Sequence, residues 1–207
     1  MTEQEQRKLA AKIVAKIDPS LRDIILDNDN CYDVIINAVK PYRDKILAMW
    51  QDTWPQEWAY RWARNIGDKD VMRDRVTEPE WAYFWARRIG DRDVMRNRVT
   101  ESEWAYHWAF RIGDHDIMRD RVTEPEWAYH WALNIEDHDV MRDRVTESRW
   151  AYWWARNIGD RDVMLDRVTE SAWAYQWAIH IGDKDVMRPI VFKDPVWKEI
   201  WIRDFGE

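Results

Sequence analysis

Residues 76–98 read VTEPEWAYFWARRIGDRDVMRNR, and close copies of this 23-residue stretch fill the middle of the chain. Each copy carries two tryptophans four residues apart. The first tryptophan of each pair recurs every 23 residues, at Trp58, Trp81, Trp104, Trp127, Trp150 and Trp173. The second lies at Trp62, Trp85, Trp108, Trp131, Trp154 and Trp177. Six copies at a fixed period of this length indicate a tandem-repeat architecture.

The spacing within a copy favours helices. Trp and Ala recur at i and i+4 and not at i and i+2, which outweighs the strand preference of Trp, Tyr and Val. Thr77 is followed three residues later by Glu80, the spacing of a capping box at a helix N-terminus. Pro79 falls in the first turn, where its missing N–H costs nothing. We therefore expect a helix that starts near Thr77.

A second, shorter helix is expected in each copy. Gly90 follows the first helix, as glycine commonly does at a helix C-terminus. Asp91 is then placed to cap a helix of about seven residues. Five of the six copies have this glycine, whereas Glu136 replaces it in the fourth, so we expect a different turn there.

The sequence thus predicts an all-α fold, an α-solenoid of six 23-residue two-helix repeats with helical N- and C-terminal caps. Repeat arrays need such caps at their open ends. We assign residues 53–190 to the six repeats, 1–52 to the N-terminal cap and 191–207 to a C-terminal capping helix. The N-terminal cap is expected to be helical at about residues 3–17, 20–26, 31–39 and 42–50.

The repeat resembles the short Tyr/Trp-Ala helical repeats of some phage and bacterial proteins, in which P-E-x-A-Y-x-Y-A-x-x-V recurs about every 23 residues. The resemblance covers about residues 54–190 and implies the fold but no function. In architecture the chain resembles α-solenoids of the tetratricopeptide and HEAT kind. The matching residues of one copy are Pro79, Glu80, Ala82, Tyr83, Trp85, Ala86 and Ile89.

Positions that are constant across the copies are expected to serve the role that all copies share, which is stacking against the neighbouring copy. On a helical wheel they form one apolar face. In the second copy the expected core residues are Trp81, Ala82, Trp85, Ala86 and Ile89 on the first helix, with Val94, Met95 and Val99 on the second.

Three positions vary, those three, six and seven residues after the first tryptophan. They share an arc of about 240–340° opposite the core, and we call them the variable stripe. These positions contain no Asp or Glu although the chain has 39 acidic and 32 basic residues and a net charge of -7. The candidate binding residues are Arg61, Arg64, Phe84, Arg87, Arg88, His107, Phe110, Arg111, His130, Trp153, Arg156, Asn157, Gln176 and His180.

Arg and large apolar residues on one stripe are typical of a partner surface. The pattern favours a non-enzymatic scaffold for a protein or peptide partner, preferably acidic. The alternative is a nucleic-acid-binding or nucleic-acid-processing HEAT-like solenoid, in which Arg contacts phosphates and aromatic rings stack on bases. The acidic net charge opposes that alternative. A plain solvated face and a structural spacer are the remaining interpretations.

Other classes of site are not indicated. The Asp91–Asp93 pair recurs in every copy, so helix capping and pairing with Arg98 explain it better than catalysis does. The constant tyrosines are expected to pack in the core with a hydrogen-bonded hydroxyl. Matched histidines in adjacent copies, such as His107 and His130, lack a third metal ligand. No cofactor motif occurs. Cys31, the one cysteine, excludes an intramolecular disulfide, and we expect a cytoplasmic protein with no membrane partner.

Overall fold

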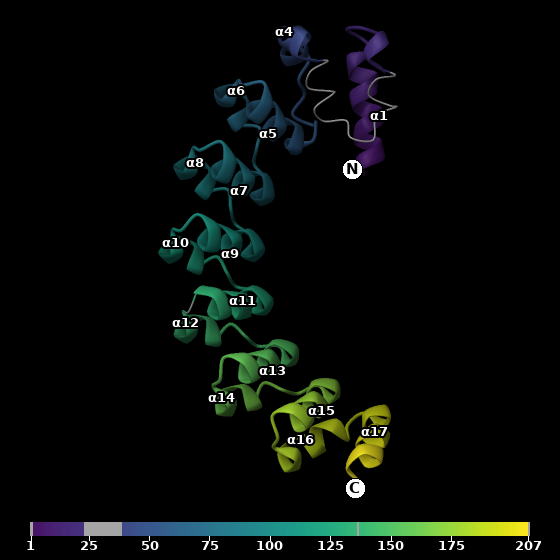
Figure 1. Ribbon diagram of the computed structural model, residues 1–207, viewed down its shortest axis with the longest axis vertical. Helices are drawn as coiled ribbons and strands as arrows, with labels where there is room; N and C mark the ends of the chain where they lie inside the picture. The colour runs from purple at the N-terminus through teal and green to yellow at the C-terminus, as the bar shows by residue number, and fades with distance from the viewer. Residues whose placement is uncertain (1, 23–38, 136, 207) are drawn as a thin grey trace. The chain divides into compact units, whose positions relative to one another are not determined.

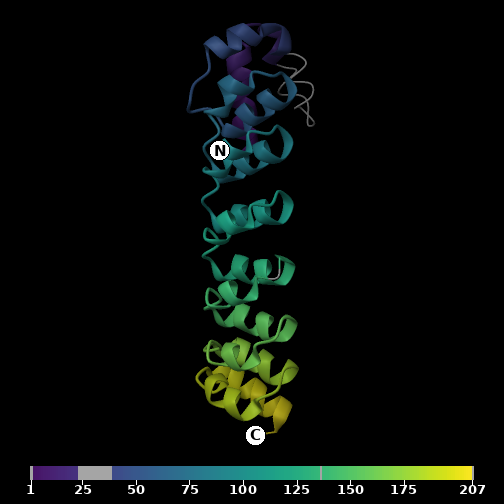
Figure 2. The ribbon, with the colours of Figure 1, turned by 90° about the vertical axis from the view of Figure 1, so that its left-hand side faces the viewer.

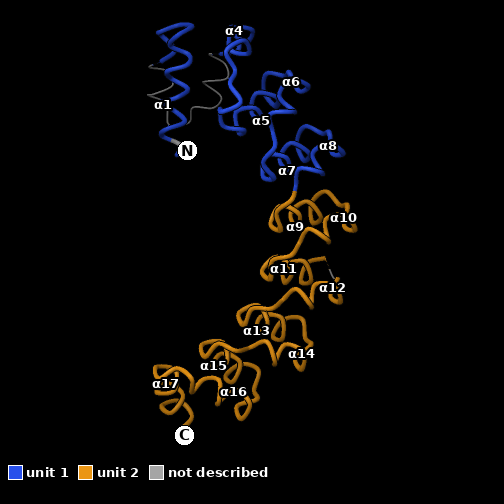
Figure 3. The backbone as a smooth tube through the Cα atoms, turned by 180° about the vertical axis from the view of Figure 1, so that it is seen from behind, with its two compact units in different colours: residues 1–99 blue, residues 100–207 orange. Residues whose placement is uncertain are grey.

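The structure is a computed structural model that describes residues 2–22, 39–135 and 137–206. Every regular element in these residues is a helix, and neighbouring helices pack together (Figure 1). The helices belong to two compact units, residues 1–99 and residues 100–207 (Figure 3).

Unit 1 opens with α1 (Glu3–Val14). Thr2 caps this helix, because its backbone N donates to Glu5 Oε2 at 2.7 Å while Glu5 N donates to Thr2 Oγ1 at 3.3 Å. Residues 20–22 are also helical, and so is residue 39. The remaining residues of the helices expected at 20–26 and 31–39, among them Cys31, lie outside the described residues. The unit continues with η1 (Lys40–Tyr42), α4 (Arg43–Ala48), α5 (Gln56–Asn65), α6 (Lys69–Arg73), α7 (Pro79–Arg88) and α8 (Arg92–Arg96).

Unit 2 consists of alternating long and short helices. Its main contacts join each long helix to the short helix that follows it and to the next long helix. The pairs therefore follow one another along this unit in the order of the sequence (Figures 1 and 2). The helices are α9 (Ser102–Arg111), α10 (His115–Arg119), α11 (Pro125–Ile135), α12 (His138–Arg142), α13 (Ser148–Asn157), α14 (Arg161–Leu165), α15 (Ser171–His180), α16 (Lys184–Val191) and α17 (Pro195–Phe205).

The turn between a long helix and its short helix uses two consecutive residues with positive φ. Gly90 has φ 120° and Asp91 has φ 56°. Glycine adopts such angles freely, and aspartate tolerates the left-handed helical region. The backbone N–H groups of Ile89 and Gly90 both donate to the carbonyl oxygen of Trp85, at 2.8 and 3.1 Å, which ends α7. The same pair of angles recurs at Gly67–Asp68, Gly113–Asp114, Gly159–Asp160 and Gly182–Asp183.

Asp91 stands at the N-cap of α8, as predicted, but its side chain does not cap that helix. Its Oδ2 instead accepts a hydrogen bond from the indole Nε1 of Trp85 at 3.3 Å. The carboxylate thus supplies the partner that a buried indole N–H needs. Equivalent bonds of 2.9–3.4 Å join Trp62 to Asp68, Trp108 to Asp114, Trp154 to Asp160 and Trp177 to Asp183.

The fourth copy differs, as the replacement of glycine by Glu136 predicts. Asp137 has φ −96°, outside the left-handed region that its counterparts occupy. Its carboxylate does not reach the indole, and Trp131 Nε1 is buried without a hydrogen-bond partner in the described part of the chain. The glycine is therefore what lets each aspartate turn back onto the tryptophan of its own repeat.

The core follows the constant positions. The second tryptophan of the pair, such as Trp85, is fully buried, as are Met95 of the short helix α8 and Val99, which lies just after that helix. The first tryptophan is half-buried in five copies, and Trp150 is buried. The prediction that Val94 belongs to the core is wrong: its side chain is exposed, because a helix of five residues turns only one side to its long partner.

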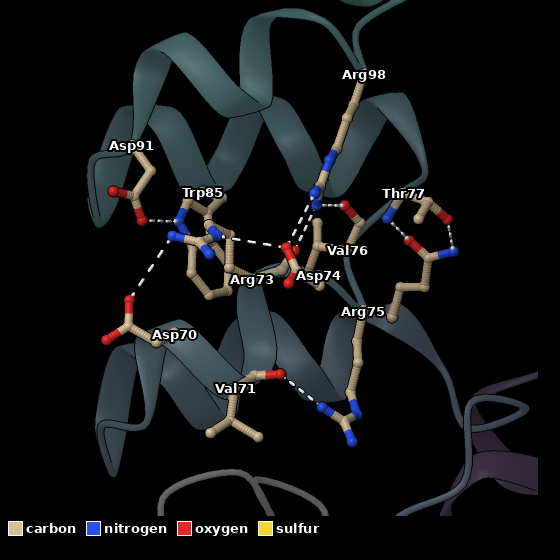
Figure 4. Close-up of polar contacts among 11 residues, drawn as sticks. Asp70, Val71, Arg73, Asp74, Arg75, Val76, Thr77, Trp85, Asp91 and Arg98 are labelled. Atoms are coloured by element: carbon tan, nitrogen blue, oxygen red, sulfur yellow. Dashed lines mark hydrogen bonds and ion pairs between the residues drawn. The ribbon is translucent and has the colours of Figure 1, made fainter.

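A constant arginine joins consecutive repeats through the backbone (Figure 4). Arg98 Nη1 donates to the carbonyl oxygens of Arg73 and Val76, the latter at 2.5 Å, at the end of α6. Its Nη2 lies 3.4 Å from Asp74 Oδ1 of the preceding copy. The predicted pairing of Arg98 with Asp91 and Asp93 is therefore wrong. Carbonyls at a helix end have no partner within the helix, and a cation satisfies them well. Arg144 and Arg167 do the same for the preceding short helices α10 and α12.

The predicted capping box is wrong. The N-cap of α7 is Glu78, with no side-chain capping bond. The preceding repeat supplies the partner: Gln56 Oε1 accepts from the backbone N of Thr77 and of Glu78, at 2.5 and 2.7 Å. In unit 2 the buried Ser148 takes this role, and its Oγ accepts from the backbone N of Thr169 at 3.0 Å and of Glu170 at 3.2 Å. Ser102 caps Thr123 and Glu124 alike.

Candidate partner-binding surface

The variable stripe lies on the long helices and divides into exposed and half-buried positions. The positions six and seven residues after the first tryptophan are exposed, whereas the position three residues after it is half-buried. Among the candidate residues, the exposed ones are Arg64, Arg87, Arg88, Phe110, Arg111, Arg156, Asn157 and His180. The half-buried ones are Arg61, Phe84, His107, His130, Trp153 and Gln176.

The half-buried position takes part in packing between repeats. In unit 2 the ring of His107 lies 5.6 Å from that of Trp104 and 5.5 Å from that of Trp127 on the next helix. His130 bridges α11 and α13 in the same way, 5.7 Å from Trp127 and 5.6 Å from Trp150. The expectation that stacking is served by the constant positions is therefore incomplete, because this variable position also takes part in it.

Burial changes the proton affinity of these two histidines. Loss of solvation lowers the pKa of His107, against the raising effect of Glu103, while Arg111 and His130 lower it further. Burial likewise lowers the pKa of His130, against the raising effect of Glu126. Both imidazoles are thus held in the neutral form, as expected for aromatic rings packed between indoles.

The position seven residues after the first tryptophan is exposed, and on α11, α13 and α15 it bonds to the preceding repeat. Asn157 Nδ2 donates to Tyr129 Oη at 2.7 Å, and Asn134 Nδ2 donates to Tyr106 Oη at 3.1 Å. His180 Nδ1 lies 3.2 Å from Tyr152 Oη. The constant tyrosines are buried, as predicted, and for Tyr106, Tyr129 and Tyr152 this variable residue of the next repeat is the partner of the hydroxyl.

The position six residues after the first tryptophan faces outward most clearly. In unit 2 it presents Phe110, Leu133 and Ile179 with exposed fractions of 42%, 43% and 45%. Arg156 occupies the same position on α13. Arg111 lies beside Phe110, with its Cζ 4.7 Å from the ring centroid. Exposed apolar side chains next to arginines suit contact with a partner better than contact with water alone.

The arc that holds the variable stripe also holds acids, because the position one residue before the first tryptophan lies within it, at about 260°, and carries glutamate in four copies. Glu57 Oε1 accepts from Arg61 Nε at 2.7 Å, so this arginine is already paired. Glu80, Glu103 and Glu126 hold the same place on α7, α9 and α11, whereas Arg149 and Ala172 replace them on α13 and α15. The position was missed because it varies only in the last two copies.

Unit 1 also holds an apolar cavity of about 100 Å³ between α1 and α5. Aliphatic side chains of α1 line one side, and the tryptophans line the other together with Arg61, which Glu57 neutralises. No sequence pattern predicts this cavity, because some of its lining residues belong to the N-terminal part of the chain, which does not follow the 23-residue period. Its tryptophans are Trp50, Trp54, Trp58 and Trp62.

The described residues bring together no group of three His, Cys, Asp or Glu side chains that could hold a metal ion. His115 Nε2 lies 3.0 Å from the carbonyl oxygen of Ala109, and His138 Nε2 lies 3.1 Å from that of Ala132. Asp93, the second acid of its pair, lies 3.4 Å from Arg96. None of the helices in the described ranges has the length and apolar character that crossing a membrane requires.

The resemblance to short Tyr/Trp-Ala repeats stays an expectation, since no protein family, no curated protein and no solved structure matches this chain.

Proposed function

We propose that this protein is a non-enzymatic scaffold, an α-solenoid of six two-helix repeats, which binds a protein or peptide partner along the variable stripe. The observation that carries the proposal is the row of outward-facing side chains six residues after the first tryptophan. In unit 2 these are Phe110, Leu133 and Ile179, each more than two-fifths exposed. These apolar side chains lie at one position of α9, α11 and α15, with Arg156 at that position of α13, and such a mixture of apolar and arginine side chains suits contact with a partner.

The division of labour between positions supports this proposal. Cross-repeat bonds use the constant arginine and tyrosine and the backbone, so stacking does not need the residue six places after the tryptophan. Its identity is free to follow a partner, and it ranges from Phe to Arg. Grooves lined by successive helices in repeat proteins bind extended segments in this way, and that comparison rests on architecture alone.

Nucleic acid is the second candidate, favoured by the exposed Arg87, Arg88 and Arg111, which lie on the stripe with Phe110. Guanidinium groups contact phosphates, and aromatic rings stack on bases. The glutamates within the same arc and the net charge of -7 weigh against a phosphate backbone. We therefore rank the peptide first.

The test compares two exposed apolar residues of the same repeat. Phe110 on α9 and Ile117 on α10 are each 42% exposed, but only Phe110 lies on the stripe. A random peptide library is selected against the protein, and the affinity of the selected peptides is measured by fluorescence anisotropy. Phe110→Ser should weaken binding about tenfold or more, which equals about 1.4 kcal/mol, while Ile117→Ser should bind like the parent.

Failure to select any peptide, or equal affinity in both variants, would contradict the proposal. A single-stranded oligonucleotide of about 20 nucleotides and its duplex serve as the second arm, at low and moderate salt. Nucleic-acid binding falls steeply with salt because counterions are released. Salt-sensitive binding that Arg87→Glu, Arg88→Glu and Arg111→Glu together abolish would favour the second candidate.

A further inference from the structure

Helix α13 differs from the other long helices along the middle of the variable stripe. The residues one place before and three and six places after its first tryptophan are Arg149, Trp153 and Arg156. At about 100° per residue they fall at about 260°, 300° and 240°, so they form one row along the helix. The two arginines are seven residues apart, which is about 10 Å along the axis.

The other long helices of unit 2 have a glutamate, or small and uncharged side chains, at these three positions. The same three positions read Glu103, His107 and Phe110 on α9 and Glu126, His130 and Leu133 on α11. On α15 they read Ala172, Gln176 and Ile179. Only the α13 row therefore has two arginines, no carboxylate and an indole between them.

Both guanidinium groups are stacked on rings of their own helix. Arg149 Cζ lies 4.7 Å from the ring centroid of Trp150, and Arg156 Cζ lies 5.3 Å from that of Trp153. Arg156 Nη1 also donates to Tyr152 Oη at 2.8 Å. Within the described residues neither guanidinium lies within ion-pair distance of a carboxylate, and both side chains are exposed.

This arrangement is ready for an anionic group. A guanidinium stacked on a ring can still donate N–H groups to a carboxylate, and Arg156 keeps its Nε and Nη2 donors for this because its bond to Tyr152 uses only Nη1. The ring also restricts the arginine before binding, so less conformational entropy is lost on binding. Arg61 of α5 shows the contrast, because Glu57 already occupies its N–H edge.

We propose that Arg149, Trp153 and Arg156 form the anchor subsite of the variable stripe, and that it binds an acidic peptide segment in an extended conformation. This inference rests on the proposed function. In a polyproline II segment, residues i and i+3 lie on one side about 9 Å apart, which matches the separation of the arginines. Glu at i and i+3 meets Arg149 and Arg156, while the half-buried Trp153 stacks on the guanidinium of Arg156.

The probe is a fluorescein-labelled synthetic peptide with the sequence GSEPFESG, and the control peptide carries Gln in place of both Glu. The protein should bind the Glu peptide about tenfold or more tightly than the Gln peptide, because each carboxylate gains a charge-assisted bond. Equal binding of the two peptides would overturn the inference.

The chain offers a matched variant. Arg149→Glu, Trp153→His and Arg156→Leu together give α13 the row that α11 already carries, so the fold should be retained, as circular dichroism and thermal melting would show. This variant should lose at least tenfold in affinity for the Glu peptide. The reverse change on α11, Glu126→Arg, His130→Trp and Leu133→Arg, should raise the number of Glu peptides bound per chain from one to two in isothermal titration. Arg156→Leu alone, a smaller change, should already weaken binding severalfold.

The outcomes separate the two proposals. If the peptides selected from the library bind the α13 variant as tightly as the parent but lose affinity to Phe110→Ser, the stripe binds a partner and the anchor assignment is wrong. If no library peptide and no Glu peptide binds the parent, both proposals fail. If a single-stranded oligonucleotide binds the parent protein but not the α13 variant, the subsite binds nucleic acid and the peptide assignment is overturned.

Discussion

The indole N–H of Trp131 is buried without a partner in the described chain, while the same group in the neighbouring repeats bonds to an aspartate. The difference traces to Glu136 in place of glycine, which shifts Asp137 to φ −96°. Glu136→Gly should restore the bond to Asp137. A satisfied buried N–H is worth about 1–3 kcal/mol, and an added glycine costs about 0.5–1 kcal/mol through the unfolded chain. We expect a net gain of up to about 2.5 kcal/mol, measured by chemical denaturation.

The converse change supplies the control. Gly113→Glu introduces the same side chain where φ is 111° and where Trp108 is bonded to Asp114. It should lower the stability by about 1–3 kcal/mol. A stabilising Gly113→Glu, or a destabilising Glu136→Gly, would show that the glycine does not control the Trp–Asp bond.

Single residues were predicted best where one period of the sequence fixes them. The alternation of Trp and Ala at i and i+4 identified the buried Trp85 and Ala86, and Gly90 marked the end of its helix. The capping partners were missed because they are not local. Thr77 is capped by Gln56, 21 residues earlier, and no short motif around Thr77 contains that information.

At the level of helices, the N-terminus of α15 depends on a side chain of α13. Ser148 is buried, and its Oγ accepts from the backbone N of Thr169 and of Glu170. Ser148→Ala should cost about 1–3 kcal/mol, because two N–H groups lose their acceptor in a place that water reaches poorly. Thermal melting followed by circular dichroism measures this loss.

Thr169→Ala is the matched control for that variant. Thr169 is exposed, and the substitution leaves in place the 3.0 Å bond from its backbone N to Ser148 while it removes only the longer contact, 3.4 Å, between the two hydroxyl oxygens. This variant should melt within about 1 kcal/mol of the parent. Equal losses in the two variants would mean that the serine does not act as a cap.

The variable stripe was identified as a set of positions but not as a set of contacts. Wheel positions show which side chains leave the core of one helix, not which of them reach the next repeat. His130 and Asn157 therefore look free in the sequence, although one packs between two tryptophans and the other donates to Tyr129. The sequence predicted the exposed Phe110 and Arg156 correctly, since no neighbouring helix covers their position.

For the molecule as a whole, stability should depend on pH in two steps. His107 and His130 have a pKa below their ordinary value of 6.5, mainly because they are buried. As the pH falls through this value the unfolded chain binds protons first, so the folded state loses stability. Asp68, which accepts bonds from Arg43 and Trp62, has a lowered pKa, as has Asp183. The stability that these two carboxylates contribute should be lost as the pH falls below 3.8, the ordinary pKa of an aspartate, towards their lowered pKa in the folded protein.

The histidine step can be removed without touching the carboxylates. Gln176 holds the corresponding place on α15, so glutamine is compatible with the repeat. His107→Gln with His130→Gln should flatten the fall in melting temperature between about pH 7.5 and about pH 5.5, and leave the step below about pH 4 unchanged. An unchanged slope in the upper range would assign the first step to other groups.

The bonds that cross from one repeat to the next have a thermodynamic consequence. Arg144 completes the end of the short helix before its own, and Ser148 completes the start of the long helix after it. A repeat cut out by itself would lose these partners at both ends, so part of its folding free energy belongs to its two junctions. Nearest-neighbour coupling of this kind makes folding spread from a folded repeat to the next one. A repeat inside the array is then more stable than the same repeat would be alone.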